Sequence, residues 1–141
     1  SWFLWRQWRP TVGALVVGVI AWQLAKVVKD QVDRGRPTDE LEDYIERWGT
    51  PPDGLGFVSG HSAVAFGLAT VLSPYLGRPW RWVAYGVATL VAVARIHVAA
   101  HFPLDTIGGA ALGCLVGWCW HLAVGVPEQV DPSVSEPDPP R

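Results

Sequence analysis

Hydrophobic residues in this chain are gathered into four apolar runs, which predict four membrane-embedded helices. The runs occupy residues 11–28, 59–75, 80–94 and 103–126. A helix needs about 20 apolar residues to cross a bilayer, so the second run is short and requires residues 55–58 or local thinning of the membrane. The pattern therefore predicts an all-α fold, a polytopic membrane helix bundle of about four spans.

The polar segments between and after these runs complete the predicted layout. Residues 38–48 begin with Thr38, a typical N-cap, and carry apolar side chains at i, i+3, i+4 and i+7 spacing. This pattern predicts a short amphipathic helix in the loop after the first span. Residues 127–141 have the proline-rich, acidic composition of a disordered tail. We expect one helical membrane domain at residues 1–126 and an acidic tail at 127–141.

Small residues at every fourth position predict that the helices pack closely. Such residues line one face of each of the last two helices: Ala84, Ala88 and Ala92, then Gly109, Gly113 and Gly117. Membrane helices use small side chains at this spacing because they let two backbones approach each other.

Charge excludes one class of partner and predicts an orientation. The net charge is -2 and no basic cluster is present, which argues against a nucleic-acid-binding protein. The arginines at positions 6, 9, 78 and 81 flank helix ends beside tryptophans, and arginine-rich ends face the cytoplasm. The junctions at residues 29–58 and 95–105 then lie on the extracytoplasmic side of a cell membrane.

The junction before the last run carries ionisable residues that suit catalysis. Pro103 fits the first turn of the last helix, which places His101 in the break and lets Asp105 turn back toward it. A carboxylate on one imidazole nitrogen fixes the tautomer and leaves the other nitrogen free as a nucleophile or base. In a purely structural interpretation, Arg95 is a snorkelling flank and Asp105 stabilises the helix start. Ionisable groups at the edge of a span favour function.

Two further polar groups are expected on the same side. Lys29 and Arg36 follow the first span, and Ser59, Gly60 and His61 open the second. Arginine and lysine bind phosphoryl oxygens, and the amides of a helix N-terminus form an anion site that glycine leaves open to close approach. Together with Arg95, His101 and Asp105 of the junction before the last run, these residues predict a phosphate-binding site.

The three groups resemble the motifs of the type 2 phosphatidic acid phosphatase (lipid phosphate phosphatase) superfamily. Those motifs are Lys-six residues-Arg-Pro, Pro-Ser-Gly-His, and Ser-Arg-five residues-His-three residues-Asp. The matching residues here are Lys29, Arg36 and Pro37; Val58, Ser59, Gly60 and His61; and Ala94, Arg95, His101 and Asp105. The match covers residues 29–105, with Val58 in place of the usual proline and Ala94 in place of the usual serine.

The resemblance implies a role for each residue. His101, oriented by Asp105, would attack phosphorus and form a phosphohistidine, and His61 would protonate the leaving group and then activate water. The phosphate would be held by the remaining motif residues: Lys29, Arg36, Ser59, Gly60 and Arg95. The cations stabilise the charge that a metal otherwise would, so no metal or other cofactor is expected. The implied substrate is a lipid phosphate or diphosphate.

Several alternatives stay open at the level of sequence. A non-catalytic phospholipid- or phosphate-binding module of the same fold is disfavoured because both histidines are present, a vanadate-dependent haloperoxidase because those enzymes are larger and soluble, and an ion pathway because the charges cluster on one side. Members of the family commonly have six spans, so a helix pair is absent, supplied by a partner or a second copy, or lost from a longer chain. His97, one helical turn before His101, is interpreted as a pocket or interfacial histidine, with tuning of the site as the alternative, and His121 is interpreted as interfacial.

Overall fold

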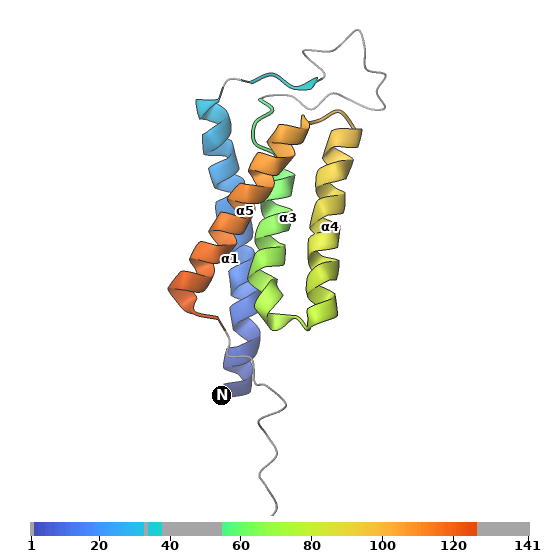
Figure 1. The fold of residues 1–141 in the computed structure, drawn as a ribbon. Coiled ribbons are helices and arrows are strands. Elements are labelled where there is room, and N and C mark those ends of the chain that lie inside the picture. The colour runs from blue at the N-terminus through green and yellow to red at the C-terminus, as the bar shows by residue number, and fades with distance from the viewer. Residues whose placement is uncertain (1, 33, 38–54, 127–141) are drawn as a thin grey trace, which may run out of the picture.

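The computed structural model describes residues 2–32, 34–37 and 55–126, and their side chains from residue 8 onward. Its elements, in chain order, are α1 (Trp2–Gln31), α3 (Gly60–Leu72), the short 3-10 helix η2 (Ser73–Tyr75), α4 (Arg78–His97) and α5 (Pro103–Val124) (Figure 1). Every regular element in these ranges is helical, which confirms the predicted all-α bundle. The amphipathic helix predicted at 38–48 and the tail predicted at 127–141 lie outside the described residues.

Helix α3 lies at the centre of the bundle, with α1, α4 and α5 packed around it (Figure 1). Small residues make its interior contacts. Ala63, which is fully buried, forms one apolar cluster with Ala21, Ala25 and Val58. A second cluster joins three valines from α1, α3 and α5: Val17, Val71 and Val116. Small side chains at these positions allow a 13-residue helix to be enclosed by three neighbours.

The glycine face predicted on the last helix is the surface on which α5 crosses α3. A Cβ atom built at Gly109 would overlap the carbonyl oxygen of Ser59, and one built at Gly113 would overlap the carbonyl oxygen of Ala63. At Gly117 the nearest atom would be Cβ of Thr70, at 2.8 Å. The two helices are therefore in backbone contact, and any larger residue would separate them.

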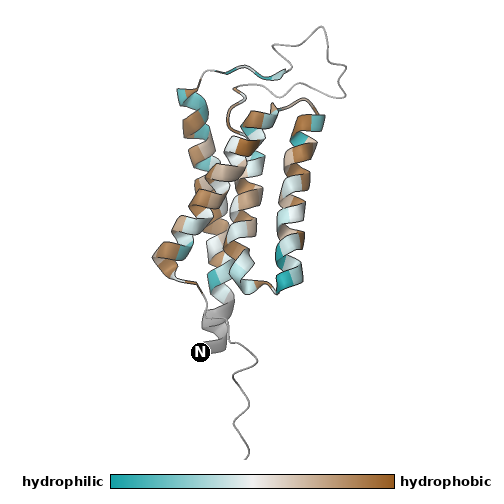
Figure 2. Cartoon of the chain, viewed as in Figure 1, coloured by the Kyte–Doolittle hydropathy of each residue, from teal (hydrophilic) through white to brown (hydrophobic). Residues whose placement is uncertain are grey.

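Large hydrophobic side chains cover the outside of the bundle. In the described part, twenty large hydrophobic side chains are exposed, for example Leu15, Leu90 and Leu122, each 66–69% exposed. They lie on α1, α4 and α5 or just after the ends of α4 and α5, and none of the twenty lies on α3. Figure 2 shows hydrophobic residues along the helices and hydrophilic ones gathered near their ends. A soluble monomer rarely exposes so much apolar surface, whereas a bundle in lipid does.

Two of the described helices are long and apolar enough to cross a membrane by themselves, Trp8–Gln31 and Pro103–Val124. Helix α4 has the length but a lower hydropathy, and α3 is short, as its apolar run indicated. The prediction of about four spans is therefore not confirmed. Helix α1 extends beyond the apolar run at 11–28 in both directions, since it begins at Trp2, continues through Pro10 and ends at Gln31.

His121 is held between two helices, a contact that its interpretation as interfacial did not include. Its side chain is buried, and its Nε2 lies 3.0 Å from the carbonyl oxygen of Thr70 on α3. The close crossing of α5 over α3 draws this last-turn histidine into the helix interface. His97, in the last turn of α4, is exposed.

Candidate active site

The junction between α4 and α5 places His101 against the end of α4. Ala99 adopts a left-handed backbone conformation with φ of 51°, which turns the chain back on itself. The amides of Ala100 and His101 then both donate to the carbonyl oxygen of Arg95, at 3.1 and 3.3 Å. This local turn brings the histidine beside the arginine that lies six positions before it.

The first turn of α5 directs Asp105 toward His101, as the sequence predicted. Pro103 is the first residue of the helix, and the Phe102 amide donates to Oδ2 of Asp105 at 2.8 Å. The same oxygen lies 3.8 Å from Nδ1 of His101. Both side chains are buried, at 2% and 0% exposure. The gap is longer than a hydrogen bond, so the two groups face each other without being bonded.

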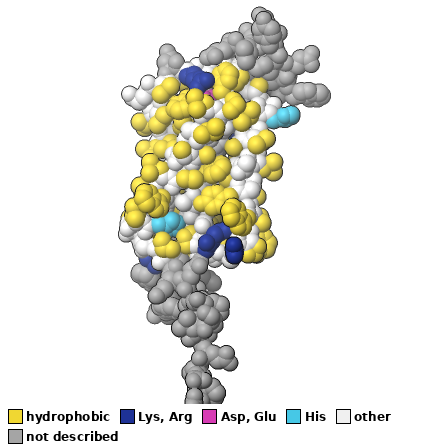
Figure 3. Space-filling view, in the orientation of Figure 1, with side chains coloured by type: hydrophobic (Ala, Val, Ile, Leu, Met, Phe, Trp, Pro, Cys, Tyr) yellow, Lys and Arg dark blue, Asp and Glu magenta, His cyan; other side chains and the backbone are white. Residues whose placement is uncertain are grey.

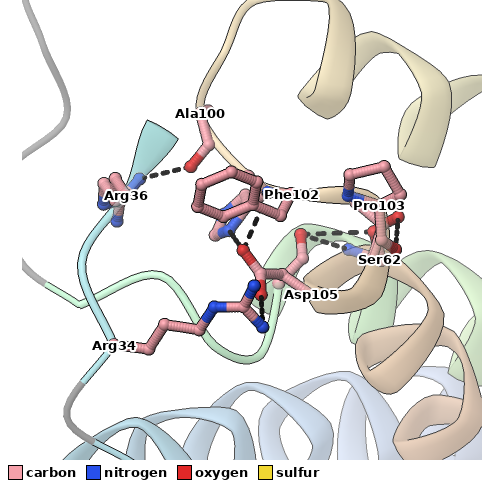
Figure 4. Close-up of polar contacts among 10 residues, drawn as sticks. Arg34, Arg36, Ser62, Ala100, Phe102, Pro103 and Asp105 are labelled. Carbon is pink, nitrogen blue, oxygen red and sulfur yellow. Dashed lines mark hydrogen bonds and ion pairs between the residues drawn. The ribbon is translucent and has the colours of Figure 1, made fainter. Parts of the chain in front are cut away.

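Arg34, which the sequence analysis did not single out, also contacts the aspartate. Its Nη1 lies 3.6 Å from Oδ1 of Asp105, and its guanidinium carbon is 4.9 Å from the centre of the Phe102 ring (Figure 4). The only sequence signal for this residue was a further arginine in the polar segment that leads to Arg36. Its partner could not be read from that position.

The N-terminus of α3 is anchored to the start of α5. Ser59 is the N-cap of α3, and its Oγ accepts hydrogen bonds from the amide and hydroxyl of Ser62 at 3.4 and 3.2 Å. The Ser59 amide donates to the carbonyl oxygen of Asp105 at 2.8 Å. The predicted anion site and the aspartate are therefore held in one register by a backbone hydrogen bond.

A tryptophan of α1 packs against the other predicted histidine. The Trp22 ring meets that of His61 edge-on, with 5.7 Å between their centres. The same ring covers Gly60, where an added Cβ would lie 3.0 Å from it. The His61 side chain is exposed, in contrast to the buried His101. Sequence reasoning missed Trp22, because nothing in its apolar run indicated which residue faces α3.

The three predicted cations surround the histidines. Arg36 is buried and donates from Nη1 to the carbonyl oxygen of Ala100 at 3.2 Å. Lys29 and Arg95 lie in the last turns of α1 and α4, and the charges of all three act on both His61 and His101. The structure thus gathers all eight predicted site residues at one end of the bundle.

These surroundings keep His101 neutral. Burial and then the positive charges of Arg36, Lys29 and Arg95 lower the pKa of His101 from 6.5 to about 4, against an opposing hydrogen bond with the Gly56 backbone. Desolvation and nearby cations both disfavour an imidazolium. An unprotonated imidazole has the free lone pair that a nucleophile needs.

Comparison with known proteins places this site in a family. The chain matches the PAP2 superfamily over residues 8–127. It is 31% identical over 123 residues to a lipid A 4'-phosphatase of Porphyromonas gingivalis, covering 77% of this chain and 51% of that protein. It is 30% identical over 116 residues to an undecaprenyl-diphosphatase of Sulfolobus acidocaldarius, covering 80% of this chain and 52% of that protein.

A solved structure shares the fold. The crystal structure of a transmembrane PAP2 type phosphatidylglycerolphosphate phosphatase from Bacillus subtilis superposes with a TM-score of 0.65 at 26% identity, covering 79% of this chain and 57% of that one. The chain spans about half the length of the curated relatives it matches. The likeness to a transmembrane protein and the two apolar helices indicate an integral membrane protein. From the family match over residues 8–127, the chain belongs to the PAP2 superfamily.

Proposed function

We propose that this chain is a membrane phosphatase that hydrolyses a lipid phosphate or diphosphate through a phosphohistidine on His101. The observation that carries the proposal is the buried pair of His101 and Asp105, 3.8 Å apart, under the charges of Lys29, Arg36 and Arg95. A neutral imidazole beside a carboxylate suits nucleophilic attack, and surrounding cations suit a phosphate.

Substrate binding is assigned to the cations and to the start of α3. Lys29, Arg36 and Arg95 would neutralise the phosphoryl oxygens, with the arginines supplying forked donors. The first amides of a helix have no acceptor within it, so the amide of Gly60 would donate to a phosphate bound in front of α3. Ser59 holds this helix start in place as its N-cap. Its hydroxyl is assigned a hydrogen bond to the phosphate, the role that the family motif implies.

The first chemical step transfers the phosphoryl group to the enzyme. The free imidazole nitrogen of His101 attacks phosphorus, and the bond from phosphorus to the lipid oxygen breaks. His61 donates a proton to that leaving oxygen, while Asp105 stabilises the positive charge that develops on the His101 ring. The products of this step are the released lipid alcohol, or the shorter phosphate, and phosphohistidine.

The second step regenerates the enzyme. His61, now unprotonated, accepts a proton from water as the water oxygen attacks the phosphohistidine. The phosphorus–nitrogen bond breaks and inorganic phosphate leaves. The exposure of His61 supports this role, because a base that exchanges protons with a leaving group and with water must be reachable by both.

The surroundings of the site support a lipid substrate. In Figure 3 a group of basic side chains at the upper end of the bundle is bordered by hydrophobic ones. A phosphate bound at this end would sit near the membrane surface with its chain along the apolar outside. We assign this end to the extracytoplasmic face of the cell membrane, because Arg9, Arg78 and Arg81 lie at the opposite ends of their helices.

Purified protein assayed against a panel of lipids tests the proposal. The panel consists of phosphatidate, phosphatidylglycerol phosphate, a polyprenyl diphosphate and a phosphorylated lipid A precursor, with released phosphate as the measurement. Turnover of at least one lipid is expected, with full activity in EDTA and inhibition by vanadate, which mimics pentacoordinate phosphorus. Further helices of the family fold would come from a partner, a second copy or a longer chain, so the assay is repeated on the natural membrane fraction.

Variants of the histidines identify the intermediate. His101→Ala should abolish both turnover and acid-labile phosphoenzyme, whereas His61→Ala should turn over slowly yet still form phosphoenzyme from an ester with a good leaving group. Asp105→Asn should lower the rate by about 10⁴, as the equivalent change does in a serine protease triad. His97→Ala, on the exposed side of α4, is the matched control and should keep activity. Phosphoenzyme that persists in His101→Ala would refute the assignment.

A further inference from the structure

We propose that Arg34 is a positioning residue that holds the Asp105 carboxylate in place for His101. This inference rests on the proposed function, since it concerns the orientation of the proposed nucleophile. Arg34 lies between Lys29 and Arg36, at a position that the first motif leaves unspecified, and would act through Asp105 without touching the phosphate.

The two carboxylate oxygens of Asp105 have different neighbours. Oδ2 accepts from the Phe102 amide at 2.8 Å and faces His101 at 3.8 Å. Oδ1 is buried and has no hydrogen-bond partner among the described residues, and Arg34 approaches it at 3.6 Å. A buried carboxylate without compensation is costly. Arg34 is therefore the cation that offsets the charge of the oxygen pointing away from His101.

The guanidinium is held in place from a second side. It lies over the Phe102 ring at 4.9 Å, a distance at which a cation is attracted to an aromatic face (Figure 4). Phe102 is also the residue whose amide binds Oδ2. Arg34 and Phe102 thus clamp the carboxylate between them, and this restricts rotation about the side-chain torsions of Asp105.

The backbone around Arg34 fixes its approach to the carboxylate. The carbonyl oxygen of Arg34 accepts from the Gly56 amide at 2.8 Å, and a Cβ built at Gly56 would lie 3.3 Å from Oδ2 of Asp105. Two residues later, Arg36 binds the carbonyl oxygen of Ala100, which directly precedes His101. The segment after α1 therefore acts on His101 in two ways. Arg36 binds the backbone just before His101, and Arg34 approaches the carboxylate of Asp105, which faces the His101 ring.

The inference predicts a defined pattern of kinetic change. Arg34→Gln should lower kcat by about 10- to 100-fold, the loss typical of residues that orient another functional group, with KM and the vanadate inhibition constant little changed. Arg34→Lys restores the charge but not the fork, and should recover part of the rate. Arg78→Gln, at an exposed arginine of α4, is the matched control and should behave as wild type.

A double-mutant cycle separates a positioning role from phosphate binding. In an Asp105→Asn background, Arg34→Gln should have little further effect, because the carboxylate through which it acts is gone. An undiminished loss in that background, or a raised vanadate inhibition constant, would make Arg34 a phosphate ligand and overturn the inference.

A spectroscopic measurement keeps the test independent of catalysis. The imidazole ¹⁵N shifts of His101, recorded in detergent micelles, report its tautomer and titration without any substrate. Arg34→Gln and Asp105→Asn should change them in the same direction, and Arg78→Gln should not. Wild-type shifts in Arg34→Gln would refute the positioning role, whereas changed shifts in a protein that hydrolyses no lipid of the panel would refute the proposed function alone.

Discussion

Replacing Gly113 with alanine tests the close crossing of α3 and α5 on which the site depends. A Cβ at this position would overlap the carbonyl oxygen of Ala63 and lie 2.8 Å from the amide nitrogen of Gly67. Ordinary contacts begin at 3.4 Å, so α5 must move away from α3 by at least 0.6 Å. The overlapped atoms belong to the backbone of a central helix, which cannot rotate out of the way as a side chain can.

The expected cost follows from overpacking. Inserting a methyl group into a well-packed interface costs about 1–3 kcal/mol. We expect the overpacking cost of Gly113→Ala to lie in the upper part of this range, because the overlapped atoms belong to the backbone. Alanine's better helix propensity returns about 1 kcal/mol, which leaves a net loss of about 2 kcal/mol. Gly86→Ala is the matched control, since a Cβ at Gly86 on α4 has no neighbour within 4 Å. That variant should be stabilised by about 1 kcal/mol through helix propensity alone.

The assay is thermal unfolding of both variants in the same detergent, followed by circular dichroism. One kcal/mol corresponds to a shift of about 4 °C for a domain of this size, so the two melting temperatures should move in opposite directions from wild type. Gly113→Ala should also lose phosphatase activity beyond its loss of stability, because the shift of α5 pulls Asp105 away from Ser59, to which it is hydrogen-bonded. Two variants that melt together, or a Gly113→Ala protein as stable as wild type, would refute the backbone contact.

Three further predictions concern pH, a backbone turn and topology. The pKa of His101 is lowered to about 4, so the unfolded chain binds a proton that the native state does not. The unprotonated His101 therefore contributes about 3 kcal/mol to the free energy of unfolding above pH 6.5, and this contribution is lost as the pH falls toward 4. The melting temperature should fall across this window less steeply in His101→Gln than in wild type, and equal slopes would contradict the prediction. Ala99→Gly should stabilise the protein by about 1 kcal/mol because glycine adopts a left-handed conformation without strain, and a lowered melting temperature would count against the turn. When the protein's own cysteines have been replaced, an impermeant thiol reagent added to intact cells should label Asp53→Cys and not Pro79→Cys. The reverse labelling would show the opposite orientation in the membrane.

The sequence by itself was sufficient for the features that depend on neighbouring residues. Proline at 103 sets the first turn of α5, and the four-residue spacing from His101 brings the Asp105 side chain back over that turn, as the structure has it. The glycines of α5 likewise predicted a close crossing, because their four-residue spacing puts them on one face of the helix, where the lack of side chains lets another backbone approach. The prediction that the motif residues gather at one end was equally sound, since successive helices of a bundle run in opposite directions.

Only the tertiary structure decided which residues from distant segments touch. Arg34 and Trp22 lie in segments whose local pattern gives no partner, yet one pairs with Asp105 and the other packs on Gly60 and His61. His121 followed the same rule, since its place beside tryptophans suggested an interface while the packing of α5 on α3 buried it. The physical reason is that spacing along a chain fixes directions within one helix only. The rotation and separation of two helices depend on all the side chains between them, so contacts across α1, α3 and α5 exist only once the bundle is assembled.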